Sequence, residues 1–103
     1  AGQPPFAWEP DRPTTVGVMP RDGTPQDMRW IEGDACYVFH FMNGSDKDGV
    51  ITLEACHFDS PPLFPMVDGT PTPANVHPSL ARWTIDMNAS NPRVKMDYLA
   101  ECV

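Results

Sequence analysis

The stretch ACYVFHFM (residues 35–42) decides the fold of this chain, and it leads through NGSDKDG (43–49) into VITLEACHF (50–58). An apolar and aromatic run, a segment of turn-forming polar residues and a β-branched run together predict a hairpin of two strands. The first strand has no polar face. A strand that is apolar on both sides is covered on both sides, so we expect residues 35–42 to lie inside a structure larger than an open two-layer sheet.

His40 is the only strongly polar side chain of this first strand, so its ring nitrogens need partners. If the seven-residue loop closes symmetrically, His40 faces Thr52 across the ladder, and Glu54 lies one diagonal step away. A hydroxyl and a carboxylate at these positions suit either a hydrogen-bonded structural histidine or a metal ligand oriented by its neighbours. The residues alone leave both interpretations open, and a structural role is the commoner one for a lone histidine in an apolar strand.

Four short motifs are spread along the chain, and their order is informative. They are GVMPRDG (17–23), RW (29–30) followed by Cys36, FHFMNG (39–44) and LARWTIDM (80–87). In this order they resemble the carotenoid cleavage oxygenase family, which includes the lignostilbene and isoeugenol cleaving enzymes. The phenylpropanoid branch is the more similar one, because FPMVDG (64–69) precedes RWTID (82–86) as in its members. Gly44 is a small departure, since the family more often has Ala there.

This resemblance implies an all-β fold of antiparallel meander sheets, equivalent to one to two blades of a seven-bladed β-propeller. It also implies a non-haem Fe(II) on the propeller axis, held by four histidines from different blades, with three glutamates bonded to those histidines. His40 falls on the histidine of the Phe-His motif and is the one metal ligand that transfers to this chain. His57 lies where the family has no ligand, His77 lies in a proline-rich loop, and Glu101 lacks the Pro-Arg that follows the family glutamate.

The length of the chain limits what it does alone. A chain of 103 residues is one small domain at most, and a closed seven-bladed propeller needs several times that length. We therefore expect residues 1–103 to be a single partial domain, a fragment of a propeller that begins and ends in mid-pattern. One histidine cannot hold a catalytic iron, so the isolated chain is expected to be inactive.

Composition excludes several classes of partner. Seven basic against fourteen acidic residues give a net charge of -7, which repels nucleic acid and anionic membranes. No apolar run approaches the roughly 20 residues that span a bilayer, and no signal-peptide pattern is present. Three cysteines without Cys-x-x-Cys spacing favour free thiols in a reducing, cytoplasmic compartment. The register expected above would place Cys36 opposite Cys56, so oxidation could join them.

The remaining pattern is that of further strands. Residues 14–19 and 27–32 predict two strands that form a three-stranded meander with 35–42. Residues 80–87 alternate, which predicts a strand whose inward side chains are Ala81, Trp83, Ile85 and Met87. Residues 93–99 predict a last strand. No helix of normal length is expected.

Two segments are rich in proline. Residues 59–79 contain six prolines and predict a long loop, because proline cannot donate to a ladder. Leu63, Phe64 and Met66 in this loop are candidates to line a substrate passage, and a small core of the loop itself is an equal alternative. Residues 1–13, with Phe6 and Trp8, are favoured as an ordered connection over a polyproline ligand for a partner domain.

Two functions follow. The first is a fragment of a non-haem Fe(II) dioxygenase that uses O2 to cleave an alkene C=C bond in an apolar aromatic or polyene substrate, of phenylpropanoid, stilbenoid or apocarotenoid type. The second is a non-catalytic β-rich fragment that self-associates through exposed strand edges or binds a protein partner.

Overall fold

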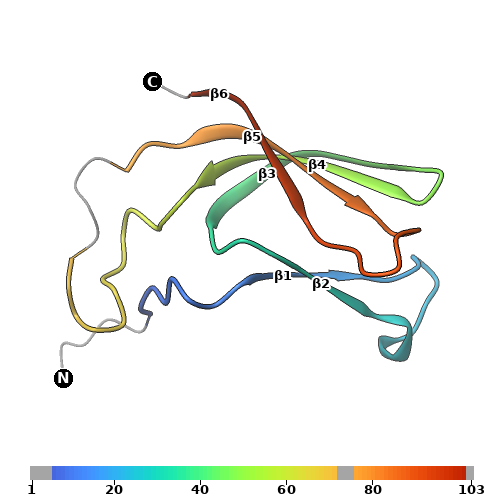
Figure 1. The fold of residues 1–103 in the computed structure, drawn as a ribbon, viewed down its shortest axis with the longest axis horizontal. Helices are drawn as coiled ribbons and strands as arrows, with labels where there is room; N and C mark the ends of the chain where they lie inside the picture. Colours follow the sequence, from blue (N-terminus) through green and yellow to red (C-terminus); the bar gives the residue numbers. More distant parts are fainter. Residues whose placement is uncertain (1–5, 72–75, 102–103) are drawn as a thin grey trace.

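The structure is a computed structural model that describes residues 6–71 and 76–101. These residues form two antiparallel sheets and contain no α-helix, as the sequence predicts. Within each sheet, neighbouring strands are consecutive in the sequence, and a short 3₁₀ turn precedes the second strand (Figure 1). The smaller sheet pairs β1 (Thr14–Val18) with β2 (Arg29–Gly33), and the 3₁₀ turn η1 is Pro25–Asp27. The larger sheet is a meander of β3 (Tyr37–Lys47), β4 (Val50–Phe58), β5 (Ser79–Asp86) and β6 (Lys95–Glu101).

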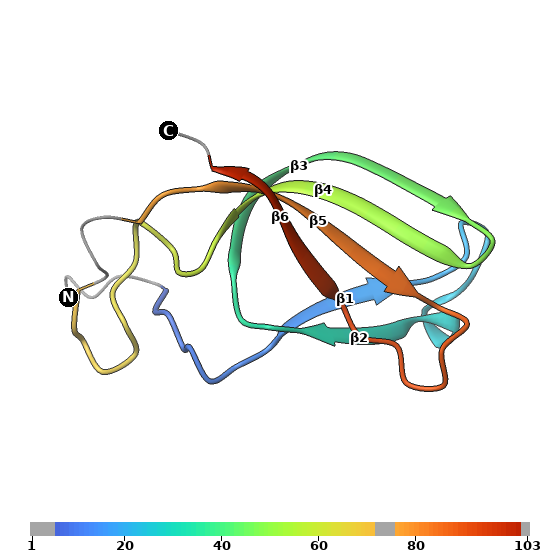
Figure 2. The ribbon, with the colours of Figure 1, turned by 45° about the horizontal axis from the view of Figure 1, so that its top comes forward.

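The core lies between the two sheets. Figure 2 shows the four-stranded sheet on one side of it and β1 and β2 on the other. Its buried cluster is Ile31, Ala81, Trp83, Ile85 and Val94, with Met87 and other apolar side chains packed against it. The predicted alternation of β5 is confirmed, because its inward side chains are buried or half-buried while Arg82 and Asp86 are exposed. A sheet with one face on a core requires this pattern.

The hairpin of β3 and β4 differs from the one predicted. The expected seven-residue loop is wrong, because the turn consists of Asp48 and Gly49 alone, and Lys47 pairs with Val50. Both turn residues have positive φ, 55° and 81°, as a two-residue hairpin with a type I′ turn requires. The polar residues 43–47 extend β3 instead of forming a loop, since an edge strand tolerates polar side chains that face solvent.

β3 is an edge strand, so the expected cover on both of its sides is wrong for the part of the chain that the structure describes. Phe39, Phe41 and Met42 are all exposed, the last at 60%. The sequence pattern indicates a strand with two apolar faces, and residues 6–71 and 76–101 supply cover for only part of it. β3 therefore presents both a free backbone edge and apolar side chains.

The predicted three-stranded meander of β1, β2 and β3 is also wrong. β2 pairs with β1, while β3 begins the other sheet. The opposite side of β2 meets the segment before β6, where the Val94 amide donates to the Glu32 carbonyl at 2.9 Å and Glu32 bridges Arg93. This contact also explains why the last strand begins at Lys95 instead of residue 93.

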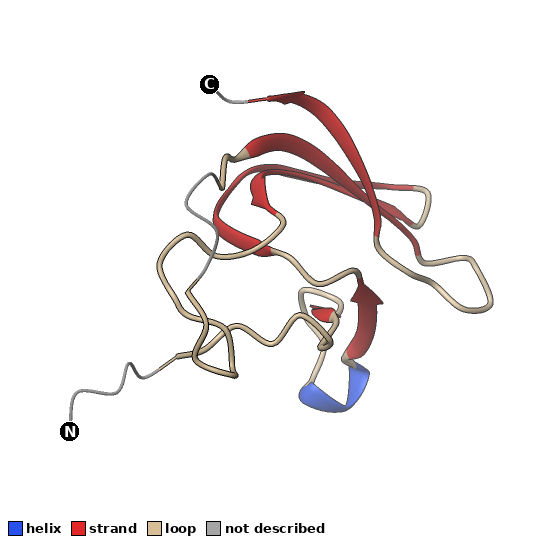
Figure 3. Cartoon of the chain, turned by 60° about the vertical axis from the view of Figure 1, so that its left-hand side comes forward, coloured by secondary structure: helices blue, strands red, loops and turns tan. Residues whose placement is uncertain are grey.

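The proline-rich segment after β4 forms no strand or helix within its described parts, 59–71 and 76–78, which agrees with the predicted loop. It lies beside the N-terminal segment (Figure 3). The Trp8 amide donates to the Pro65 carbonyl, and the Val67 amide donates to the Trp8 carbonyl, both at 2.7 Å. Trp8 thus belongs to an ordered connection, as favoured above for residues 1–13, of which 1–5 lie outside the described residues. Among the described residues, no helix has the length and apolar character needed to cross a bilayer.

Candidate functional site

His40 lies in an irregular part of β3. Val38 pairs with His57 and Phe41 pairs with Ala55, so Phe39 and His40 together oppose a single residue of β4. This arrangement is a β-bulge, and a second register shift follows between Phe41 and Asn43. Bulges re-aim side chains and occur often beside active sites. His40 itself is exposed at the free edge of the sheet.

Aromatic packing fixes the residues on both sides of His40. The Phe39 ring lies 4.8 Å from that of Tyr37 and 5.6 Å from that of Phe58, both edge-to-face. The Phe41 ring lies 5.2 Å from that of Trp83, also edge-to-face. Such pairs contribute about 0.5–1.5 kcal/mol each beyond their burial. The backbone of His40 is therefore held by its neighbours while its ring stays open to solvent.

The observed strand register does not place Thr52 or Glu54 in the positions beside His40 that the predicted register gave them. Thr52 pairs with Ser45 and Glu54 pairs with Asn43, so neither faces His40. Glu54 instead accepts a bond from the Arg82 guanidinium at 3.3 Å. The prediction failed because it assumed a long loop and a regular ladder. The Asp-Gly pair could have indicated the tight turn, but nothing in the sequence marks the two irregularities.

His57, which was not expected to bind a metal, is buried, with 3% of its surface exposed. Its Nδ1 lies 3.4 Å from Trp83 Nε1, and its Nε2 lies 3.4 Å from Asp59 Oδ1 and 3.5 Å from Tyr98 Oη. Tyr98 Oη donates to Asp59 Oδ1 at 2.6 Å, and this bond raises the pKa of Tyr98 to about 12. His77 is exposed in the loop before β5.

Among residues 6–71 and 76–101, no group of three or more His, Cys, Asp or Glu side chains converges on one point. This part of the chain therefore offers His40 as a single imidazole and not a complete metal site. Cys36 and Cys56 are free thiols, and the observed register does not place them opposite each other. Cys36 Sγ lies 3.3 Å from Thr14 Oγ1, and burial raises the pKa of its thiol.

The three loop candidates have different surroundings. Phe64 packs edge-to-face on Phe6 at 5.4 Å and on Tyr37 at 6.1 Å, while Leu63 is exposed and Met66 bridges to Trp8 through the backbone. The loop thus shares a small apolar cluster with the N-terminal segment. A cavity of about 310 Å³ there is lined by Phe6, Ala7, Trp8, Tyr37, Pro61 and Phe64.

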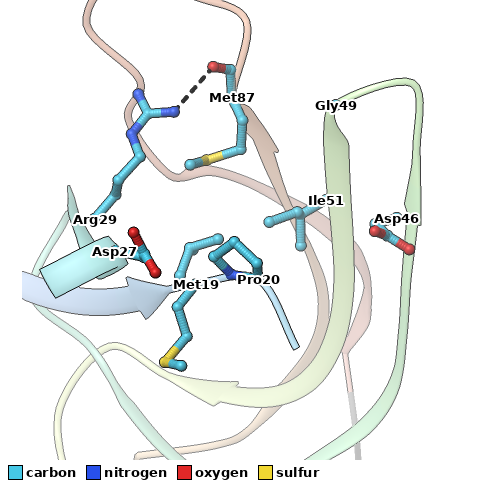
Figure 4. A pocket seen from close by; sticks show the side chains of 9 residues that line it. Met19, Pro20, Asp27, Arg29, Asp46, Gly49, Ile51 and Met87 are labelled. Atoms are coloured by element: carbon cyan, nitrogen blue, oxygen red, sulfur yellow. Dashed lines mark hydrogen bonds between the residues drawn. The ribbon is translucent and has the colours of Figure 1, made fainter. Parts of the chain in front are cut away.

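A second cavity, of about 430 Å³, lies at the other end of β3, next to the hairpin turn (Figure 4). The Arg29 guanidinium reaches across it and donates to the Met87 carbonyl at 3.3 Å. Its other lining residues are Val18, Met19, Pro20, Asp27, Asp46, Gly49 and Ile51. The contact ties β2 to the end of β5, so we regard this cavity as part of the junction between the two sheets.

The known proteins that are similar to this chain agree with one another. Residues 1–102 match the family model described as retinal pigment epithelial membrane protein. Isoeugenol monooxygenase of Pseudomonas putida is 36% identical over 103 residues, which cover 98% of this chain and 22% of that protein. Lignostilbene-alpha,beta-dioxygenase isozyme III of Sphingomonas paucimobilis is 32% identical, over 88% of this chain and 20% of its own length.

A solved structure agrees with these relatives. The crystal structure of lignostilbene dioxygenase from Pseudomonas brassicacearum matches with a TM-score of 0.83 and 32% identity, over 94% of this chain and 21% of that one. The two sheets thus resemble one to two blades of a β-propeller enzyme. The chain spans about a fifth of the relatives that it matches, 20–22% of the two proteins above. By this match over nearly its whole length, the chain belongs to the family of retinal pigment epithelial membrane protein and of the carotenoid, lignostilbene and isoeugenol oxygenases.

Proposed function

We propose that this chain is part of a non-haem Fe(II) dioxygenase that cleaves an alkene C=C bond of a phenylpropanoid, stilbenoid or apocarotenoid with O2. The names of its relatives support an oxygenase acting on molecules of this kind. The observation that carries the proposal is the placement of His40. The histidine of the Phe-His motif lies exposed on a free edge strand, within a bulge, where side chains from other segments can join it.

The residues present fit one ligand of an iron site. A neutral imidazole is a good ligand for ferrous iron, and a set of histidines adds no negative charge beside an apolar substrate. His40 would hold the ion through a ring nitrogen. The bound ferrous ion would provide the reactivity toward O2. The remaining ligands would come from parts of the longer protein outside these 103 residues. The pairing that motivated Thr52 and Glu54 is not observed, so the proposed site contains His40 without them.

The chain's own residues would position and shield this site. Phe39 and Phe41 fix the backbone on both sides of His40 through their contacts with Phe58 and Trp83. Apolar side chains around a metal site control the access of water and the local dielectric. Leu63, Phe64 and Met66 are proposed to line the path of the apolar substrate, and Phe64, which borders the 310 Å³ cavity, has the strongest support. The two free thiols support a reducing, cytoplasmic setting.

The test uses the full-length protein that carries this segment. His40→Ala should abolish iron retention and the O2-dependent conversion of an alkene substrate into two carbonyl products. His77→Ala is the matched control, because it removes an exposed imidazole from a loop, and it should leave both unchanged. Metal analysis and product identification provide the two measurements. A His40→Ala protein that keeps stoichiometric iron and activity would refute the ligand assignment.

A second function, self-association of the isolated chain, is favoured by the free edge of β3. Phe41 and Met42 are 52% and 60% exposed beside unpaired backbone groups, and such edges pair with other chains. We expect the isolated 103 residues to form iron-free oligomers in analytical ultracentrifugation. An iron-containing monomer would contradict this second proposal.

A further inference from the structure

His57 is the only buried polar side chain among the described residues, and the proposed iron site does not use it. It lies on the inner face of β4 with three polar partners from three other places in the chain: Asp59, Trp83 on β5 and Tyr98 on β6. We call these four residues the His57 network. Burying an imidazole without partners is unfavourable, so the network must satisfy both ring nitrogens.

The donors and acceptors define one arrangement of protons. An indole N–H only donates, so the 3.4 Å contact from Trp83 Nε1 requires an unprotonated Nδ1 on His57. The proton of the neutral ring then lies on Nε2, which faces Asp59 Oδ1 and Tyr98 Oη. Tyr98 uses its own proton on Asp59 at 2.6 Å, so its oxygen can accept from the imidazole. Every member has a partner, and the ring has one orientation.

The His57 network lies directly beside the bulge that carries His40. His57 pairs with Val38, the last residue before the bulge. Trp83 packs edge-to-face on Phe41, the first residue after it, with ring centroids 5.2 Å apart. The Trp83 and His57 rings are also in contact, with centroids 6.1 Å apart. The network therefore lies next to both ends of the two-residue segment that contains His40.

We propose that the His57 network positions His40 by fixing the bulge of β3 from the inner face of the sheet. This inference rests on the proposed role of His40 as an iron ligand. His57 acts through Val38 and Phe41 and does not itself touch the metal. Groups that orient a metal ligand typically change metal affinity by about 10- to 100-fold when they are removed.

The variants separate positioning from general stability. His57→Leu removes all three polar contacts of the ring, and Trp83→Phe keeps a ring against Phe41 but removes its N–H. His57→Gln places an amide donor near the site of Nε2 and serves as the conservative replacement. Ile85→Ala is the matched control, because it destabilises the same core on the same strand as Trp83 and removes no hydrogen-bonding group of the network.

The experiment measures Fe(II) affinity of the full-length protein by chelator competition, and the EPR spectrum of its ferrous nitric oxide complex. We expect His57→Leu and Trp83→Phe to weaken Fe(II) binding roughly 10- to 100-fold and to alter the spectrum. His57→Gln should restore most of the affinity, and Ile85→Ala should leave the spectrum unchanged. An unaltered spectrum and affinity in His57→Leu, or equal losses in Ile85→Ala, would overturn the proposal. If His57→Leu does not fold, Trp83→Phe decides the result.

Hydrogen exchange on the iron-free protein keeps this test separate from that of the proposed function. If the network fixes the bulge, the amides of residues 39–42 should exchange faster in His57→Leu and Trp83→Phe than in the parent or in Ile85→Ala. Should His40→Ala retain iron while this exchange pattern is found, the ligand assignment fails and the positioning of the bulge stands. Unchanged exchange in both network variants would reject the positioning proposal whatever His40 binds.

Discussion

Replacing Gly49 by alanine tests the hairpin that sets the register of β3. Gly49 has φ of +81°, and an added Cβ would lie 2.5 Å from Nδ2 and 2.7 Å from Oδ1 of Asn88. The left-handed conformation costs about 1–2 kcal/mol for a residue with a Cβ. Displacing Asn88 also breaks its 2.8 Å bond to the Asp48 carbonyl, which contributes about 1 kcal/mol. We expect Gly49→Ala to lower the free energy of unfolding by about 2–3 kcal/mol.

Gly69→Ala is the matched control for this substitution. Gly69 has φ of +87°, but no heavy atom lies within 4 Å of an added Cβ, so the change should cost the conformational part alone. Urea unfolding followed by tryptophan fluorescence provides the comparison. In an Asn88→Ala background, the cost of Gly49→Ala should fall to about that of Gly69→Ala. Equal costs of Gly49→Ala in both backgrounds would refute the role given to Asn88.

The remaining predictions concern the core and two titrating groups. Gly33→Ala should lower the free energy of unfolding by about 1–3 kcal/mol in urea unfolding. The new Cβ would lie 2.7 Å from the Val94 Cβ, and side-chain rotation cannot separate these two atoms because both are attached directly to the backbone. Ile85→Ala removes most of a fully buried side chain and should cost about 2–5 kcal/mol in the same assay. The folded-state pKa of Tyr98 is raised to about 12 from 10.0, so the stability it contributes is present below pH 10 and is lost as pH rises toward 12. Urea unfolding across this range should show a decline that Tyr98→Phe reduces, and an identical decline in the variant would contradict the assignment. Since burial raises the pKa of the Cys36 thiol, iodoacetamide at pH 8 should alkylate it more slowly in the folded chain than in urea, as peptide mass spectrometry can measure.

Much of the architecture could be predicted from local patterns. The alternation of residues 80–87 correctly identified which side chains of β5 enter the core, because successive side chains of a strand point to opposite faces. The proline content of residues 59–79 correctly predicted the absence of a strand or helix in the described residues 59–71 and 76–78, since proline removes the donor that a ladder needs. The order of four motifs indicated the family that the comparisons show.

The surroundings of the candidate site were predicted less well. The apolar run at 35–42 suggested a covered strand, yet β3 is an edge with Phe41 and Met42 exposed. Burial depends on which other segments pack against the strand, and a local pattern does not say whether they are present. The neighbours proposed for His40 were wrong because register propagates from the turn, and a turn shorter than expected moves every pair.

The sequence by itself determined the all-β class, the inward face of β5, the proline-rich loop and the histidine that the family motif singles out. Each of these follows from residues that are close together along the chain. Only the tertiary structure decided the register of β3, the bulge at His40 and the network that joins His57 to Asp59, Trp83 and Tyr98. Those features depend on contacts between residues up to 41 positions apart. Such contacts form only when the strands align. No single segment of the sequence contains both partners of such a contact, so the alignment is selected by free energies that arise only in the folded chain.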